Sequence, residues 1–185
     1  MALTLHPLTE KIAHELLQFE LDNRAFFESM IPSRGDNYYS FPVFLGILQG
    51  LIKKYEKGTA FMYIIRNEAG EIIGRINLVN IKKDTKTAEL GYRIGEAFGS
   101  KGFATEAVRL VLQEAKKHGL HYVQASTIDM NEASQAVLVK NHFQLVSREC
   151  GRIQLDDKTY DVLTFQYDCT KELQPLKAEA CPNGK

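Results

Sequence analysis

Cysteine is scarce in this 185-residue chain, and its few cysteines show no pattern of pairing. Cys150, Cys169 and Cys181 are odd in number and lack C-x-x-C spacing, which indicates neither a disulfide framework nor a zinc site. Long apolar runs are also missing, because none approaches the roughly 20 residues of a membrane-spanning helix. The N-terminus contains acidic Glu10 and Glu15 and has no apolar core of the kind found in signal peptides. We therefore expect reduced thiols, no membrane partner and a cytoplasmic location.

An excess of charge of one sign is absent as well, because 23 lysines and arginines balance 23 aspartates and glutamates. No electrostatic property of the whole chain therefore favours nucleic acid as a direct partner. Neither common nucleotide loop is present, since the chain contains no G-x-x-x-x-G-K-[ST] and no G-x-G-x-x-G sequence. The length fits one domain that buries about 70% of its unfolded surface. We expect this domain to span residues 1–168, with residues 169–185 as a loose C-terminal extension.

The periodicity of apolar residues and the placement of turn residues predict an α+β protein, with mixed α/β order along the chain. Thr9 is placed to cap the first helix, and Gly119 to follow the end of a longer one. The polar stretch 33–40 is predicted to be a loop, and residues 156–158 the tip of a hairpin. Helices are expected over about 10–21, around 26–30, and over 43–55, 103–118 and 132–141, and strands over about 60–66, 71–80, 87–95, 122–128, 143–153 and 160–168.

The strongest signal lies in residues 87–112, where an alternating segment leads through a short glycine-bearing loop into an amphipathic helix. Leu90 and Tyr92 fall on one side of the segment and Glu89 on the other, which indicates a strand with two different faces. The helix that follows has an apolar stripe typical of a helix packed on a sheet, made of Ala104, Ala107, Val108, Val111, Leu112 and Ala115.

The loop between them, residues 99–104, has the properties of a binding site for phosphate groups. A helix N-terminus offers unpaired N–H groups and the positive end of the helix dipole. Gly99, Gly102 and Ala104 leave the approach to that end open, and Lys101 adds a positive charge. Taken alone, the loop is equally compatible with an ordinary tight connection between a strand and a helix.

A second segment, residues 131–143, adds to the first, and together they resemble the GNAT superfamily of acetyl-CoA-dependent N-acetyltransferases. Gly102 and Ala104 match the last two positions of the family's loop pattern, Gln/Arg-x-x-Gly-x-Gly/Ala. Gly99 replaces the usual Gln or Arg of that pattern. The resemblance covers about residues 60–168 well and the N-terminal part loosely.

The later segment carries the other half of the resemblance. Asn131 and Ser134 match the family's Asn-x-x-Ser, and Lys140 and Phe143 match the basic residue and the phenylalanine that follow it. His142 stands where the family usually has glycine. The Glu-Leu-Gly-Tyr of residues 89–92 is similar to the RimJ/RimL branch, whose members acetylate protein N-termini, including those of ribosomal proteins.

The resemblance implies the GNAT fold, a mixed and mostly antiparallel sheet with helices on both faces. It also implies that the strands before and after the loop's helix diverge, which leaves a splayed slot for the cofactor. The pantetheine arm of acetyl-CoA would pair with the backbone in this slot, and the diphosphate would lie on the loop. The residues implied in cofactor binding are Tyr92, Arg93, Ile94, Gly99, Ser100, Lys101, Gly102, Phe103, Ala104, Thr105, Asn131 and Lys140.

Transfer of acetyl to an amine needs a neutral amine, a stabilised oxyanion and a proton for the departing thiolate. Glu89 is the candidate base, directly or through water, because the matching position carries the base carboxylate in some GNAT enzymes. Ser134 is the candidate proton donor to the sulfur by the same resemblance. Two structural alternatives stay open. Glu89 could be a surface carboxylate paired with a Lys or Arg, and Asn131 could cap a helix with Ser134 at its third position.

Two other groups of residues are more ordinary. His118 and His121 flank the end of a predicted helix and lack a third ligand in sequence, so no metal is expected. Aromatic residues of the N-terminal part fit either core packing or, by the resemblance, an acceptor site; they are Phe26, Phe27, Tyr38, Tyr39 and Phe41.

The sequence therefore predicts an N-acetyltransferase that transfers acetyl from acetyl-CoA to a primary amine by direct attack in a ternary complex. A protein or peptide N-terminal α-amine is the expected acceptor. A small amine, such as a polyamine or an aminoglycoside, is the alternative within the enzyme class. A non-catalytic acyl-CoA-binding module stays open because of Gly99 and His142, and assembly into a homodimer is left open as well.

Overall fold

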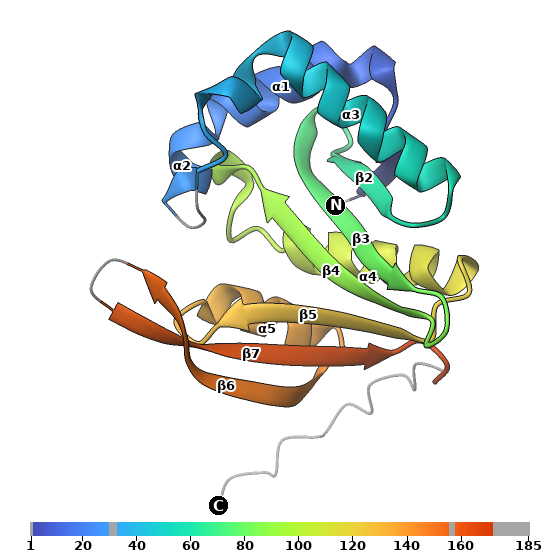
Figure 1. Ribbon diagram of the computed structural model, residues 1–185, viewed down its shortest axis with the longest axis vertical. Helices are drawn as coiled ribbons and strands as arrows, with labels where there is room; N and C mark the ends of the chain where they lie inside the picture. Colours follow the sequence, from blue (N-terminus) through green and yellow to red (C-terminus); the bar gives the residue numbers. More distant parts are fainter. Residues whose placement is uncertain (1, 30–32, 156–157, 172–185) are drawn as a thin grey trace, which may run out of the picture.

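The computed structural model describes residues 2–29, 33–155 and 158–171. Within them, strands form one mixed sheet in the order β1-β2-β3-β4-β5-β7-β6 (Figure 1). β4 and β5 pair in parallel, whereas the other neighbours in this order are antiparallel. The strands are β1 Thr4–Pro7, β2 Phe61–Arg66, β3 Ile72–Lys82, β4 Thr87–Ile94, β5 Tyr122–Ile128, β6 Gln144–Leu155 and β7 Lys158–Asp168.

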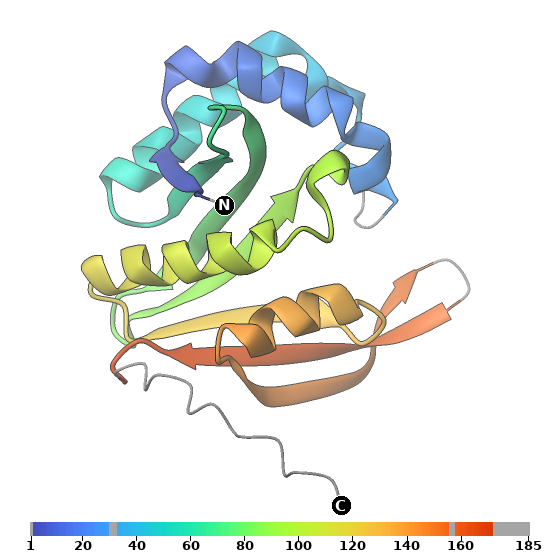
Figure 2. The ribbon, with the colours of Figure 1, turned by 180° about the vertical axis from the view of Figure 1, so that it is seen from behind.

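Helices cover both faces of the sheet, as Figures 1 and 2 show from opposite sides. One face carries α1 Ala13–Asp22, α2 Arg24–Glu28 and α3 Phe41–Glu56. The other face carries α4 Phe103–Lys117, with α5 Glu132–Lys140 beside it over β5. Short 3₁₀ helices stand before α1, before α3 and before α4: η1 Glu10–Ile12, η2 Asp36–Tyr39 and η3 Glu96–Phe98. The predicted fold class, an α+β fold with a mixed, mostly antiparallel sheet and helices on both faces, is confirmed.

Each face of the sheet has its own hydrophobic core, because successive residues of β2 and β3 point to opposite sides and are buried on both. Ile65 and Ile76 pack under α4, whereas Ile64 packs with Leu16 and Leu48 under α1 and α3. Burial of one such side chain stabilises the fold by about 1.5–3 kcal/mol. The predicted stripe of α4 is confirmed, with Ala104 half-buried and these five members buried: Ala107, Val108, Val111, Leu112 and Ala115.

The sheet splits between β4 and β5. β3 pairs with β4 along its whole length, from Ile94 back to Thr87. β5 pairs with β4 only at Thr87, Ala88 and Glu89, and beyond Glu89 the two strands diverge (Figure 1). The second half of β4 therefore presents a backbone edge toward β5 that no strand of the described residues covers. This is the splayed slot that the sequence resemblance predicts.

Several local expectations are wrong. β1 escapes a pattern search because its four residues, which include Pro7, are too few to show alternation, and it is held as an edge strand by pairing with β2. The predicted loop at 33–40 contains η2. Thr9 stands before the first helix, but its side chain makes no capping bond. Gly119 does follow α4 with φ of +72°, as predicted.

Other expectations lie outside the described residues. The hairpin tip at 156–157 and the extension from residue 172 onward belong to this group. In the parts of the chain that the structure describes, no helix is long and apolar enough to cross a membrane.

Candidate active site

The edge of β4 at the split is built from the three residues predicted to meet the pantetheine arm. Tyr92 and Ile94 turn their side chains into the core under α4, and Arg93 turns its side chain to the opposite face. The backbone groups that point toward β5 have no strand partner among the described residues. A chain of amides such as pantetheine can complete this edge as an added strand would. The side chains and the backbone of these residues thus have separate roles.

After β4 the chain reaches α4 through η3 and a sharply turning loop. Ser100 has φ of +57° and Gly102 has φ of +80°, a left-handed conformation that glycine adopts without strain. No side chain in the described residues caps α4, so the first N–H groups of the helix stay open to an anion. Lys101 remains at the loop, where its Nζ donates to the Ala97 carbonyl at 2.9 Å. These features fit a diphosphate.

Gly99 is the C-cap residue of η3, with an extended backbone that any residue can adopt. A Cβ at this position would lie 3.3 Å from the Glu96 carbonyl oxygen, a tight contact that a larger residue would meet by a small shift. The absence of a side chain leaves this part of the loop without the long polar group that the family usually has.

The far end of α5 lies against the beginning of α4. The buried side chain of Asn141 donates from Nδ2 to the Thr105 carbonyl at 3.1 Å and to the Val137 carbonyl at 2.9 Å. Lys140, the preceding residue, is exposed in the last turn of α5. It is thus one residue away from the contact between α5 and the start of α4, where the diphosphate is expected. His142 follows with φ of +61°, which agrees with its place in a position usually held by glycine.

The near end of α5 meets β4 across the split. Asn131 is the N-cap, and its Oδ1 accepts from the Ser134 backbone N–H at 3.0 Å. Asn131 therefore caps α5 with Ser134 at its third position, as the structural alternative has it. The cap uses the backbone N–H of Ser134 and leaves its hydroxyl free for another contact. That hydroxyl lies 3.2 Å from the Tyr92 Oη. Burial raises the pKa of the Tyr92 phenol, while its contact with Ser134 acts in the opposite direction. The phenol is therefore protonated at neutral pH.

Glu89 lies on the other face of β4, at the last residue that still pairs with β5. Its side chain is exposed, and its Oε2 accepts from the Asn80 Nδ2 at 2.7 Å. The carboxylate thus lies at the surface, as the structural alternative in the sequence analysis has it. The pairing with Lys or Arg that this alternative includes is not seen, because the partner in the described residues is an amide.

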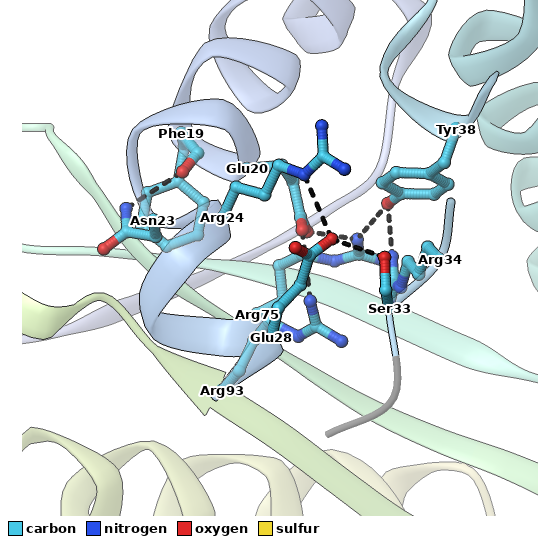
Figure 3. A network of polar contacts seen from close by, with 10 residues as sticks. All are labelled: Phe19, Glu20, Asn23, Arg24, Glu28, Ser33, Arg34, Tyr38, Arg75 and Arg93. Carbon is cyan, nitrogen blue, oxygen red and sulfur yellow. Dashed lines mark hydrogen bonds and ion pairs between the residues drawn. The ribbon is translucent and has the colours of Figure 1, made fainter. Parts of the chain in front are cut away.

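A group of charged residues that the sequence analysis missed lies on the same face as Glu89 (Figure 3). Glu20 of α1 is fully buried, with one carboxylate oxygen 2.6 Å from Arg75 of β3 and the other 3.1 Å from Arg93 of β4. The Tyr38 hydroxyl accepts from Arg75 at 3.3 Å and also from Arg34. The sequence did contain a signal for this group, because the carboxylate of Glu20 falls at helical spacing from Leu16 and Leu17 on the apolar stripe of the first helix.

The charged group borders a cavity of about 260 Å³ between α1, α3 and the strands β2 and β3. Its polar lining consists of Arg34, Tyr38, Arg75 and Asn77, and the remaining wall is apolar. The predicted aromatic residues of the N-terminal part divide here, because Tyr38 lines the cavity whereas Phe27 is in the core.

No group of three or more His, Cys, Asp or Glu side chains gathers to hold a metal ion within the described ranges. His118 instead stacks on Phe61, and its Nε2 lies 3.0 Å from the Tyr63 Oη. Burial lowers the pKa of His118, which favours the neutral ring in this packing role.

Comparison with known proteins places these features in a family. Residues 2–144 match the family described as "Acetyltransferase (GNAT) domain". The chain is 32% identical over 142 residues to a probable N-acetyltransferase, YjcK, of Bacillus subtilis, covering 75% of this chain and 78% of that protein. It is 26% identical over 153 residues to the ribosomal-protein-serine acetyltransferase of Escherichia coli, covering 78% and 80%.

A solved structure agrees at the level of the fold. It is RimL, a ribosomal-protein alpha-N-acetyltransferase in complex with coenzyme A, with a TM-score of 0.81 and 24% identity, covering 91% of this chain and 94% of that one. The split sheet, the open start of α4 and the matching motifs all lie in the region that the family covers. The chain therefore belongs to the GNAT acetyltransferase family and is an acetyl-CoA-dependent N-acetyltransferase.

Proposed function

We propose that this enzyme transfers acetyl from acetyl-CoA to the α-amine at the N-terminus of a protein or peptide. The observation that carries the proposal is the meeting of Tyr92 and Ser134 across the split, 3.2 Å apart, beside the free edge of β4. Both residues come from segments that resemble the RimJ/RimL branch. The relative named for acetylating a serine of a ribosomal protein supports the same acceptor class.

In the proposed complex, the cofactor extends from the start of α4 to the start of α5. The diphosphate lies on the backbone N–H groups of Ser100–Thr105 with Lys101 and Lys140 near it, and the pantetheine arm pairs with the edge of β4. The thioester then lies beside the hydroxyl pair of Tyr92 and Ser134. Asn131 keeps Ser134 in place through its capping bond.

We propose that Ser134 gives a proton to the departing sulfur. Its hydroxyl accepts a hydrogen bond from the protonated phenol of Tyr92 or donates one to it, so the two groups form a hydroxyl pair that can supply a proton. Loss of the leaving thiolate is easier when it is protonated or hydrogen-bonded as it departs.

Glu89 is the proposed base, acting directly or through one water. It lies on the acceptor side of β4, and its exposed carboxylate is held by Asn80. An α-amine has an unperturbed pKa near 8, against about 10.4 for lysine, so far more of it is neutral at pH 7. A single solvated carboxylate is therefore adequate for an α-amine.

The test is turnover of acetyl-CoA with a panel of matched amines. Peptides with a free α-amine should be acetylated, whereas N-terminally blocked peptides with internal lysines should not. Spermidine and an aminoglycoside are the comparison acceptors. A much higher kcat/KM for either of them than for any peptide would contradict the proposed acceptor class.

A further inference from the structure

The cavity beside Glu20 lies next to the proposed reaction centre. Asn77 on its floor pairs in register with Gly91 of β4, and Gly91 stands between Glu89 and Arg93. Neighbouring strands are about 4.8 Å apart, so the cavity floor is one strand away from the edge that receives the cofactor. A Cβ at Gly91 would meet nothing within 4 Å, which shows that the space above β4 is open on this face.

Positive charge is in excess at the polar end of this cavity. Arg75 and Arg93 both bind the buried carboxylate of Glu20, and Arg34 joins the group through the Tyr38 hydroxyl (Figure 3). Arg34 forms no ion pair within the described part of the chain and donates instead to the Tyr38 hydroxyl. Burial lowers the pKa of Arg93, and the charges of Arg34 and Arg75 add to this effect against Glu20. The positive charges of Arg34 and Arg75 therefore disfavour the charged form of Arg93.

The neighbouring charges do not cancel this excess. Arg24 lies beside the group and binds both nearby carboxylates, Glu28 at 3.0 Å and Asp36 at 2.6 Å. Asp36 is also 91% exposed, so water screens its charge. With Arg24, Glu28 and Asp36 included, the group contains four cations and three anions.

One buried polar atom of the cavity has no partner. The Oδ1 of Asn77 is shielded from solvent and accepts no hydrogen bond within the described residues. Buried polar groups are nearly always paired, and Asn77, whose amide is not fully paired, is also one of the polar residues that line the cavity. The apolar wall opposite, formed mainly by α3 with Leu16 and Met62, fits an aliphatic side chain.

We propose that this cavity binds the N-terminal segment of the acceptor and selects one with an aliphatic side chain next to a carboxylate. The aliphatic group lies against α1 and α3, the carboxylate is bound by Arg34 with Arg75 behind it, and the Asn77 amide bonds the peptide backbone. This inference rests on the proposed acceptor class and narrows it to acidic N-termini. Polycations are excluded by the same arginines.

The first experiment compares kcat/KM for heptapeptides that begin with serine and carry leucine at position two or three. When leucine is at position two, position three is Glu, Gln or Lys, and when leucine is at position three, position two is Glu, Gln or Lys. The peptides are otherwise identical. A hydrogen-bonded charge pair corresponds to about tenfold or more, so Glu should exceed Gln by at least that factor in one of the two orders, with Lys lowest. Equal rates for Glu and Gln within twofold in both orders would overturn the inference.

Variants of Arg34 identify the group responsible. Arg34 is exposed, so Arg34→Gln and Arg34→Glu should fold, which the rise of Tm with acetyl-CoA checks. Arg34→Gln should reduce the preference for Glu, and Arg34→Glu should reverse it in favour of Lys. Arg152→Gln is the matched control, because Arg152 is an exposed arginine of β6. An unchanged preference in Arg34→Glu would overturn the assignment.

A binding measurement separates this inference from the proposed function. N-acetylated Glu and Gln peptides of the same series are titrated calorimetrically into the enzyme with coenzyme A, so no turnover is needed. Tighter binding of the Glu peptide that Arg34→Glu abolishes would support the cavity assignment even if no peptide were acetylated. Acetylation of peptides without any such difference would leave the proposed function in place and refute the cavity assignment.

Discussion

Replacement of Glu20 by Gln should destabilise the fold strongly. The side chain is fully buried, and its two oxygens lie 2.6 Å from Arg75 and 3.1 Å from Arg93. Glutamine keeps the shape of the side chain but removes the negative charge that binds both of these cations. Arg75 has 7% of its side chain exposed, so water cannot replace the lost charge.

The expected size follows from this burial. Removal of one partner of a buried ion pair costs about 3–5 kcal/mol, a large share of the roughly 5–15 kcal/mol that stabilises a typical domain. For a chain of this length each kcal/mol lowers Tm by about 2–4 °C, so Tm should fall by about 6–20 °C. Urea unfolding gives the free energy directly, and an unchanged m-value shows that the unfolding transition is the same.

Glu15→Gln is the matched control on the same helix. Glu15 also binds an arginine through both oxygens, Arg66 at 2.6 Å, but 48% of its side chain is exposed. Exposed pairs contribute about 0–1 kcal/mol, so this variant should lose little. Similar small losses in both variants would refute the argument that burial makes Glu20 indispensable.

Three further predictions concern the reaction. Gly102→Val should remove the rise of Tm with acetyl-CoA, which corresponds to about 2.7 kcal/mol at an acetyl-CoA concentration of 100 times Kd. Gly70→Val is the control, because Gly70 has a similar φ of +81°, and this variant should keep the rise. A rise in both variants would contradict the placement of the diphosphate on the loop at 99–104. Ser134→Ala should lower kcat by roughly 10²-fold with little change in the KM for acetyl-CoA, because proton donation to sulfur matters in the transition state. A change in KM alone would make Ser134 a cofactor contact. The pH profile of kcat/KM should rise as the base or the amine loses its proton, and Glu89→Gln should lower its alkaline plateau; an unaltered plateau would exclude Glu89 as the base.

The sequence was most informative where local pattern and packing agree. The stripe of α4 and the motif around Asn131 are local, so the positions of both helices and the capping bond from Asn131 could be predicted. The family resemblance added the split of the sheet, which no local pattern contains. Elements that depend on distant pairing were harder. β1 exists because β2 pairs with it, and the paired residues are 56 to 62 positions apart along the chain.

The sequence analysis missed some site residues for the same reason, because their contacts join distant parts of the chain. Arg75 is an ordinary strand residue until α1 brings Glu20 against it, a contact across 55 positions. Asn141 looked like a helix end, and only the packing of α5 on α4 gives its amide a partner at Thr105. Glu89 shows a different limit, because its strand and face were predicted from the local pattern, whereas its partner Asn80 was not.

The length of α5 has a consequence of its own. This nine-residue helix holds Ser134 near one end, whereas Asn141, just past the other end, ties it to the first turn of α4. At 1.5 Å per residue the helix spans about 14 Å, and it fixes the distance between the proposed diphosphate site and the proposed proton donor. One inserted residue would turn Ser134 by about 100° relative to the anchored end. Such an enzyme would still hold its cofactor but would present the wrong face of the helix to the thioester.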